Sequence, residues 1–408
     1  MKYTVVSREQ LPQVEELWDY CFEKRQEPFF QYYFTQYCCQ QNIVMGAFDE
    51  EEQLKSMVHV NPYRLRVRGA EQLVPYLVGV ATAPEARGAH IVKPLLQTTL
   101  ASLRAQGVNF VTLMPIFAGI YLPYEFSYCY YRHAYKLPLA ALTLPRVDAR
   151  LTVKRVPLAA ELLAPLYASC LRDINGVPVR SDEQWQKLLT VHAQEGVLCA
   201  VCQREGANVG YMLYTISAGV FHVHELLAED AQAKNRLLQF AATHQSSAQE
   251  LSWLAEPWDK TYLHFNDQSA TGSVAPFMMA RCLNVKLALE QLENVNAALK
   301  GSVVLQVTDK LLGGVTLEVQ LADGCVQAQT VQALPEVSMG VGAFTQLYFG
   351  TFSADELWEA GLIECRNVEK LTLLDEVLAE GKNVCKRIFL KRILSNFSFS
   401  LAGFSASV

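Results

Sequence analysis

One segment, residues 77–96, limits the possible folds of this chain more than any other. It opens with an apolar run over residues 77–82 and then passes through a short turn led by Pro84. It reaches Gly88 at the start of a helix, which the apolar spacing predicts over about 89–106. A strand that passes through a tight turn into a helix is a unit of α/β architecture. We therefore expect a sheet with helices packed against it.

The turn between this strand and this helix has the features of an anion site. A helix N-terminus leaves several amide N–H groups without acceptors and carries partial positive charge. Gly88 permits close approach of a ligand to the backbone, and Arg87 adds a full positive charge. The sequence thus predicts that the turn holds a phosphate or pyrophosphate. The preceding strand offers backbone groups to an extended, amide-containing ligand if its neighbour splays away.

The segment lies in the first of three parts of the chain. Residues 1–140 alternate strand-like and helix-like runs, and a boundary falls near 138–150, where prolines interrupt the pattern. Residues 151–285 repeat the same order of elements. Residues 226–231 stand where the first copy has its turn, and they contain no glycine. Two copies of one layout are therefore expected.

The last part, residues 286–408, has a different order of elements. Strand-like runs with a turn at Asp323-Gly324 precede three helix-like runs. Ser353 and Glu356 have the spacing of a capping box at the start of the second of these helices. This part is expected to form an α+β domain.

Composition limits the compartment and the kinds of partner. A formal net charge of -6 makes the chain a poor generic binder of nucleic acid or anionic lipid. No apolar run approaches the ~20 residues that span a bilayer, and residues 1–6 resemble a strand more than a signal peptide. The 11 cysteines are scattered, and Cys199 and Cys202 lie in a strand-like run. Reduced, mostly buried thiols in a cytoplasmic protein without a metal site are expected.

The strand–turn–helix segment resembles the acetyl-CoA loop of the GNAT acetyltransferase superfamily. In that superfamily the strand pairs with pantetheine and the loop amides hold the pyrophosphate. The superfamily usually has glycine at the position of His90, and often glycine or alanine at that of Val92. A β-carbon is costly where φ is positive, so the alternative is a scaffold that no longer binds the cofactor. The resemblance implies that acetyl-CoA (coenzyme A) is bound by Val78, Gly79, Val80, Arg87, Gly88, Ala89, His90 and Ile91.

Residues 119–126 resemble the Ile-Tyr-x-x-Phe-Gly stretch of the same superfamily, with Glu125 where glycine is common. The tyrosine of this stretch is the general acid of the family and corresponds to Tyr121. A phenol with a pKa of about 10 can protonate a departing thiolate whose thiol has a pKa near 8.5. The resemblance makes Tyr121 the predicted catalytic acid, and a tyrosine packed in the core is the alternative.

Residues 281–285 and 339–352 resemble the linker and the sterol-carrier-like domain of the enhanced intracellular survival (Eis-like) family. Together with the two stretches above, the resemblance covers nearly the whole chain. It implies two tandem GNAT-like mixed-sheet α/β domains over 1–140 and 150–285. The second of these is expected to be degenerate, and a sterol-carrier-like α+β domain follows over 286–408.

The family resemblance also implies the reaction. Such enzymes transfer acetyl from acetyl-CoA to a primary amine of an aminoglycoside, polyamine or lysine-like molecule, and they commonly assemble as hexamers. Their terminal carboxylate reaches the cleft as base or substrate anchor, which here would be that of Val408. The expected partners are a small-molecule amine and further copies of this chain, with no nucleic acid, membrane or metal.

Two other functions remain open from the sequence. The chain could be a non-catalytic scaffold that binds a lipid or protein partner, or it could acetylate protein amino groups. Asp19, Glu23 and Glu27 are spaced by four, as on one helix face that would attract an amine or simply be solvated. The aromatic residues within 29–37 would either wall an amine pocket or pack in the core.

Overall fold

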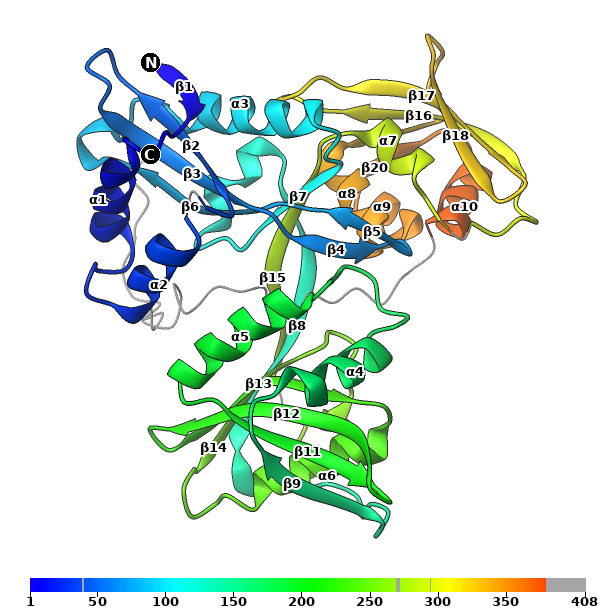
Figure 1. Cartoon of the computed structure of the whole chain (residues 1–408). Helices are drawn as coiled ribbons and strands as arrows, with labels where there is room; N and C mark the ends of the chain where they lie inside the picture. Colours follow the sequence, from blue (N-terminus) through cyan, green and yellow to red (C-terminus); the bar gives the residue numbers. More distant parts are fainter. Residues whose placement is uncertain (39, 269–271, 294, 379–408) are drawn as a thin grey trace.

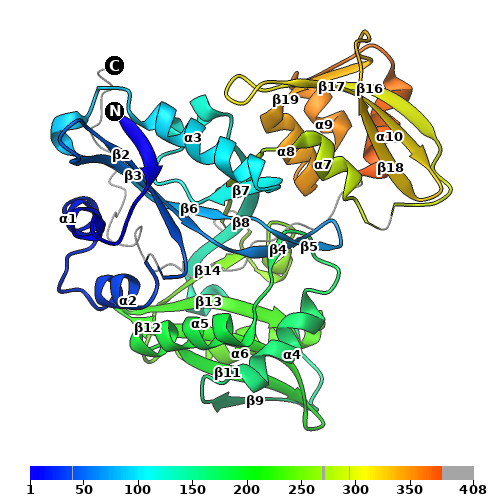
Figure 2. The ribbon, with the colours of Figure 1, turned by 45° about the horizontal axis from the view of Figure 1, so that its top comes forward.

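The computed structural model describes the chain except residues 39, 269–271, 294 and 379–408. Figure 1 shows the N-terminal and C-terminal parts at the top of the molecule and the middle part below them. Figure 2 shows the C-terminal part beside the N-terminal one, on the side of α3 and β7. The expected fold class, two mixed-sheet α/β domains followed by an α+β domain, is confirmed.

The first part alternates strands and helices as expected. Its elements are β1 (Lys2–Val5), α1 (Leu11–Cys21), α2 (Pro28–Gln36), β2 (Ile43–Phe48), β3 (Leu54–Asn61), β4 (Arg64–Val67), β5 (Ala70–Leu73), β6 (Tyr76–Thr82), α3 (Val92–Ala105), β7 (Phe110–Leu113) and β8 (Ser127–Pro138).

The middle part repeats much of this order. Its elements are β9 (Leu151–Val156), α4 (Ala160–Cys170), β10 (Val177–Pro178), α5 (Asp182–Gln194), β11 (Leu198–Arg204), β12 (Ala207–Ser217), β13 (Val220–Ala228), α6 (Ala231–Ala242), β14 (Glu250–Ala255) and β15 (Ser273–Cys282). Cys199 and Cys202 are buried on β11, as predicted, and neither forms a disulfide.

The last part is built on a separate five-stranded sheet in the order β18-β17-β16-β19-β20. The predicted turn at Asp323-Gly324 is confirmed, with φ values of 53° and 75°. The predicted capping box of Ser353 and Glu356 is confirmed as well. The elements are α7 (Val285–Glu290), β16 (Gly301–Thr308), β17 (Val315–Ala322), β18 (Cys325–Thr330), β19 (Val337–Gly340), α8 (Val341–Phe349), α9 (Ala354–Glu359), β20 (Ile363–Cys365) and α10 (Val368–Val377).

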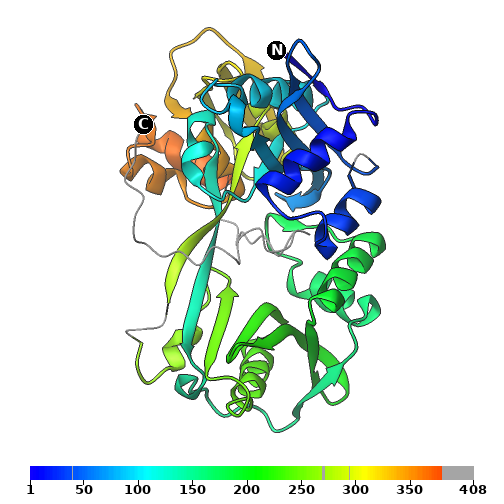
Figure 3. The same ribbon diagram turned by 90° about the vertical axis from the view of Figure 1, so that its left-hand side faces the viewer.

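A single 12-stranded sheet joins the first two parts, in the order β1-β2-β3-β6-β7-β15-β8-β14-β13-β12-β11-β9. β15 comes from the end of the middle part, yet it lies between β7 and β8 and pairs antiparallel with both. β8 also pairs with β14 of the middle part. Figure 3 shows β8 and β15 running side by side from the upper half of the molecule to the lower half. The sequence patterns predicted neither strand.

The first part also contacts the last one through a side chain from the β4–β5 turn. Arg68 donates to the carbonyls of Tyr348 and Leu347 (2.6 and 3.0 Å) and to that of Leu378 (2.9 Å). These carbonyls end α8 and α10, where helices lack internal donors. The Arg68 guanidinium therefore satisfies carbonyls at the C-terminal ends of two helices of the last part.

One expectation about the N-terminal region was wrong. The first helix begins at Leu11 after a turn and has Gln10 as its N-cap. That helix ends at Cys21, so Asp19, Glu23 and Glu27 do not share a helix face. Instead Asp19 accepts from the amide of Arg25, and Glu23 accepts from the indole of Trp18. The helix α2, which the sequence analysis did not predict, buries Phe29, Phe30, Tyr33 and Phe34 in the core.

None of the helices in the described residues is both long and apolar enough to cross a bilayer.

Candidate functional site

The predicted cofactor strand, β6, is only partly paired on its β7 side. β6 and β7 run parallel and pair at Tyr76 and Leu77, beyond which β6 has no partner on that side among the described residues. The other edge of β7 is taken by β15. β6 therefore diverges from its neighbour after Leu77, and its backbone from Val78 onward is available to an extended ligand.

β6 contains a β-bulge at this point of divergence. Met57 of β3 lies opposite Ala81 and His59 lies opposite Val78, so that Gly79 and Val80 together oppose one residue of β3. Gly79 has a φ of 60°, the left-handed conformation that a bulge of this kind requires. The bulge interrupts the regular ladder with β3 at Gly79 and Val80.

Two rings fill the space beside Gly79. A β-carbon on Gly79 would lie 2.5 Å from Cζ3 of Trp18 and 3.0 Å from Cδ2 of His59. His59 is fully buried, and its Nδ1 lies 2.9 Å from the hydroxyl of Tyr33. Desolvation lowers the pKa of His59 to about 3, so the imidazole is neutral at pH 7. The place of these rings beside the strand was not predicted, because in the sequence each ring indicates only a core residue.

We expect Gly79→Ala to lower the free energy of unfolding by about 2–4 kcal/mol. The β-carbon would overpack against Trp18, and alanine would be held at a positive φ. Urea unfolding measures the loss. Gly107→Ala is the matched control, because Gly107 has a φ of 79° but no atom within 4 Å of the added carbon. Equal losses in the two variants would contradict the packing argument.

The predicted phosphate turn connects β6 to α3. A short 3-10 turn at Pro84–Ala86 precedes it, Gly88 has a φ of 79°, and His90 has a φ of 54°. His90 thus holds the conformation for which the superfamily uses glycine. Within the described part of the chain, hydrogen-bond partners are lacking for the amides of Gly88, His90, Ile91 and Val92.

The start of α3 has no cap of its own. Its N-cap residue is Ile91, whose side chain cannot accept a hydrogen bond. The residues from Arg87 to His90 are exposed, so a ligand can reach the free amides and the Arg87 guanidinium. Free donors, partial positive charge and a nearby cation together suit a phosphate group.

The middle part differs at the equivalent strand–helix turn. Asp230 caps α6 by accepting from the amide of Ala233 at 2.8 Å. The same carboxylate also accepts from Arg204 at 2.7 Å. A carboxylate thus already holds the helix N-terminus and would repel a phosphate.

Tyr121 lies close to the cofactor-binding elements. It is partly buried in the apolar cluster that also contains Val80 and Ile91, and its ring lies 6.0 Å from that of Phe126. Its hydroxyl makes no hydrogen bond with any described residue. Burial raises the pKa of Tyr121 to about 12, so the phenol keeps its proton at neutral pH.

Glu125 takes the second position at which the superfamily uses glycine. It ends the short turn Leu122–Tyr124 with a φ of 62° and a ψ of 25°. Both replacements for glycine, His90 and Glu125, are therefore held in the left-handed region. The remaining predicted site residue, Val408, lies outside the described residues, and its role stays a prediction.

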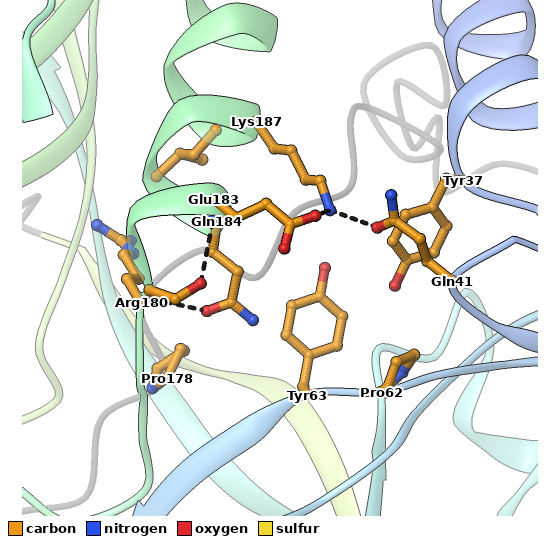
Figure 4. Close-up of a pocket in the computed structure, with 11 residues that line it drawn as sticks. Tyr37, Gln41, Pro62, Tyr63, Pro178, Arg180, Glu183, Gln184 and Lys187 are labelled. Carbon is orange, nitrogen blue, oxygen red and sulfur yellow. Dashed lines mark hydrogen bonds and ion pairs between the residues drawn. The ribbon is translucent and has the colours of Figure 1, made fainter.

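A cavity of about 340 Å³ lies between the first two parts (Figure 4). Lys187 reaches across it from α5, lying 2.5 Å from Glu183 and bonding to Gln41 of the first part. The cavity is lined by Tyr37, Gln41, Pro62, Tyr63, Pro178, Arg180, Ser181, Glu183, Gln184, Lys187 and Leu188. The sequence analysis did not find this cavity. The only local signal was the capping box that starts α5, at Ser181 and Gln184.

The cavity is linked to the β6 bulge through aromatic residues. The ring of Tyr37 lies 5.5 Å from that of Tyr33, and the Tyr33 ring lies 4.9 Å from Trp18. Trp18 in turn lies against Gly79. Residues of α1 and α2 therefore form the wall between the cavity and the splayed strand.

Comparisons with known protein families give three matches along the chain. Residues 2–129 and residues 176–282 match two different models, each described as an acetyltransferase (GNAT) domain. Residues 285–386 match a model described as a sterol carrier protein domain. No curated protein sequence matches the chain.

Several solved structures are similar over 95% of the chain. A conserved Enterococcus faecalis protein of unknown function, described as a "Probable N-Acyltransferase", has a TM-score of 0.85, 22% identity and 99% of its own length covered. A GCN5-related N-acetyltransferase from Anabaena variabilis has a TM-score of 0.81 at 19% identity, and Eis1 from Mycobacterium abscessus has 0.74 at 17%. Both of these are covered over 100% of their length. At these identities the likeness shows a shared fold.

Proposed function

We propose that this acyltransferase, built from two GNAT domains and a C-terminal sterol carrier protein domain, transfers the acetyl group of acetyl-CoA to a primary amine. GNAT domains generally use acyl-CoA donors. The observation that carries the proposal is that the first domain combines a bulged, partly unpaired β6 with an α3 whose start has no side-chain cap. In the second domain Asp230 already caps the start of α6, so we expect only the first domain to bind the donor.

The donor is proposed to lie along β6 and over the turn that follows it. The backbone of Val78, Gly79 and Val80 would meet the pantetheine amides, since this edge of the strand is unpaired. The free amides of the turn and the Arg87 side chain would hold the pyrophosphate. His90 supplies an exposed imidazole beside those amides, which offers one further donor to a phosphate oxygen.

The proposed reaction is a direct attack. The neutral amine adds to the thioester carbon, which forms a C–N bond and moves the carbonyl π electrons onto oxygen. The carbonyl re-forms from this tetrahedral intermediate as the C–S bond breaks and the thiolate leaves. The Val80 amide would donate to the carbonyl oxygen as negative charge develops on it. Tyr121 would protonate the departing sulfur, and the proton lost by the amine goes to water or to the carboxylate of Val408. Burial raises the pKa of the phenol, and it acts in the same direction on the coenzyme A thiol.

The acceptor is proposed to enter through the cavity between the first two domains. Tyr37 and Tyr63 give it aromatic surface, and the Glu183 carboxylate, which pairs with Lys187, would exchange that partner for the ammonium group of the acceptor. The acceptor classes expected from the Eis-like resemblance are aminoglycosides, polyamines and lysine-like amines. Cytoplasmic location and assembly into a hexamer are part of the same proposal.

Calorimetry with acetyl-CoA and a thiol-release assay over an amine panel test the proposal together. We expect binding of acetyl-CoA and amine-dependent release of thiol. Arg87→Ala should weaken acetyl-CoA binding about 10-fold, because it removes a charge-assisted contact worth roughly 1.5 kcal/mol. Arg146→Ala is the control, because Arg146 is also exposed and is remote from α3 in sequence. No heat of binding at millimolar acetyl-CoA would refute the proposal and favour a non-catalytic scaffold that binds a lipid or protein partner.

A further inference from the structure

One loop of the sterol carrier protein domain reaches into the first GNAT domain. We call residues 309–312, between β16 and β17, the docking loop. Leu311 is buried in the apolar cluster that contains Tyr121. The carbonyl of Leu311 accepts from Gln97 at 3.1 Å, and that of Leu312 accepts from Arg104 at 3.0 Å. The docking loop is thus bound to α3, the helix whose start forms the candidate phosphate site.

The docking loop is also bound to the segment that carries Tyr121. Arg281, whose side chain is fully buried, donates to the carbonyl of Tyr124 at 2.8 Å. Its guanidinium also donates to the carboxylate of Asp309 at 2.7 Å. Asp309 accepts in addition from the amides of Leu311 and Leu312, at 2.9 and 2.7 Å. One buried cation therefore ties the backbone beside Tyr121 to the docking loop.

Glu125 makes a second link between the same two segments. Its carboxylate accepts from the amide of Lys310 at 2.8 Å and lies 3.8 Å from Arg281. A glutamate at a φ of 62° is strained relative to an ordinary backbone conformation. The hydrogen bond to Lys310 and the nearby Arg281 cation offset this strain. A glycine at this position would avoid the strain, but it would make neither contact.

We propose that the docking loop is a positioning element of the active site, with Glu125 and Arg281 as positioning residues that hold the Tyr121 segment in place. The inference rests on the proposed function, because it assigns the sterol carrier protein domain a part in proton donation by Tyr121. Neither residue is proposed to touch the substrates. Tyr121 lies only four residues from Glu125, which ends the short turn that follows Tyr121.

The kinetic test compares Glu125→Ala with Glu125→Gln in the full chain. We expect Glu125→Ala to lower kcat about 10-fold while the KM for acetyl-CoA changes less than 2-fold. Glu125→Gln keeps an acceptor for the Lys310 amide and should recover kcat to within about 3-fold of wild type. In a Tyr121→Phe background, Glu125→Ala should add less than a 2-fold effect, because the group that it positions is gone. Glu359→Gln, on the exposed surface of the sterol carrier protein domain, is the control.

Hydrogen–deuterium exchange supplies a readout that does not depend on activity. Amides of residues 119–127 should exchange about 10-fold faster in Glu125→Ala, and at the wild-type rate in Glu359→Gln. Unchanged exchange, or kinetic losses that multiply in the double variant, would overturn the inference. If wild type releases no thiol, the proposed function fails, and the exchange rates alone then decide whether Glu125 holds the segment.

Discussion

Tyr121→Phe is expected to lower kcat about 10²–10⁴-fold, the usual contribution of a positioned general acid. The variant removes one hydroxyl, which makes no hydrogen bond with any described residue, so folding should be little affected. The affinity for acetyl-CoA should stay within about 2-fold, because the pyrophosphate contacts lie at Arg87 and the start of α3. Thiol release at saturating donor and amine measures kcat, and calorimetry measures the affinity.

Tyr124→Phe is the matched control for this experiment. Tyr124 lies on the same short turn and is also partly buried, but it does not occupy the motif position of the general acid. Its kcat should remain within about 2-fold of wild type. Because the pKa of Tyr121 is about 12, wild-type kcat should show no alkaline fall from this group below about pH 11. Equal effects of the two variants would remove Tyr121 from the mechanism.

Glu225→Ala is expected to lower the free energy of unfolding of the second domain by about 3–5 kcal/mol. Glu225 pairs with Arg180 through two hydrogen bonds of 3.0 and 2.7 Å, and both side chains are only 4% exposed. The guanidinium also lies over the rings of Tyr167 and Trp185. Removal of the carboxylate leaves a buried cation without its counter-ion, and it leaves the Tyr211 hydroxyl without its acceptor.

Urea unfolding followed by tryptophan fluorescence measures this loss, since Trp185 lies beside the pair. Glu250→Ala is the matched control. Glu250 pairs with Lys136 at 3.5 Å, but the two side chains are 37% and 75% exposed, so the expected loss is below about 1 kcal/mol. Similar losses in the two variants would contradict the argument from burial.

The features of the fold that depend on local sequence were predictable. The strand before α3, the turn at Asp323-Gly324 and the capping box at Ser353 each follow from a few neighbouring residues, and all three are present. β8 and β15 were not predicted. Their place in the sheet depends on partners far away in the sequence, since Ser273 of β15 pairs with Ala134 of β8. The pattern of neighbouring residues does not indicate which distant strand will be the partner.

The candidate site likewise has a part that local sequence predicts and a part that depends on residues far apart in the sequence. The free amides after β6 follow from strand, turn and helix, so residues 87–91 could be named from the sequence. The conformations of His90 and Glu125 agree with the glycine positions that the resemblance identified. The cavity around Lys187 and the link from Glu125 to the docking loop could not be predicted. Each joins residues from different domains, and these residues come together only after folding.

The late position of β15 in the chain also bears on how the protein is made. The N-terminal sheet lacks a strand between β7 and β8 until residues 273–282 have left the ribosome. β8 ends at Pro138, so 144 further residues (282 minus 138) must be synthesised first. At about 5–20 residues per second, this takes roughly 7–30 s. During that interval the edges of β7 and β8 are open to wrong partners, so nascent chains would benefit from chaperones, and slower translation would lengthen their exposure.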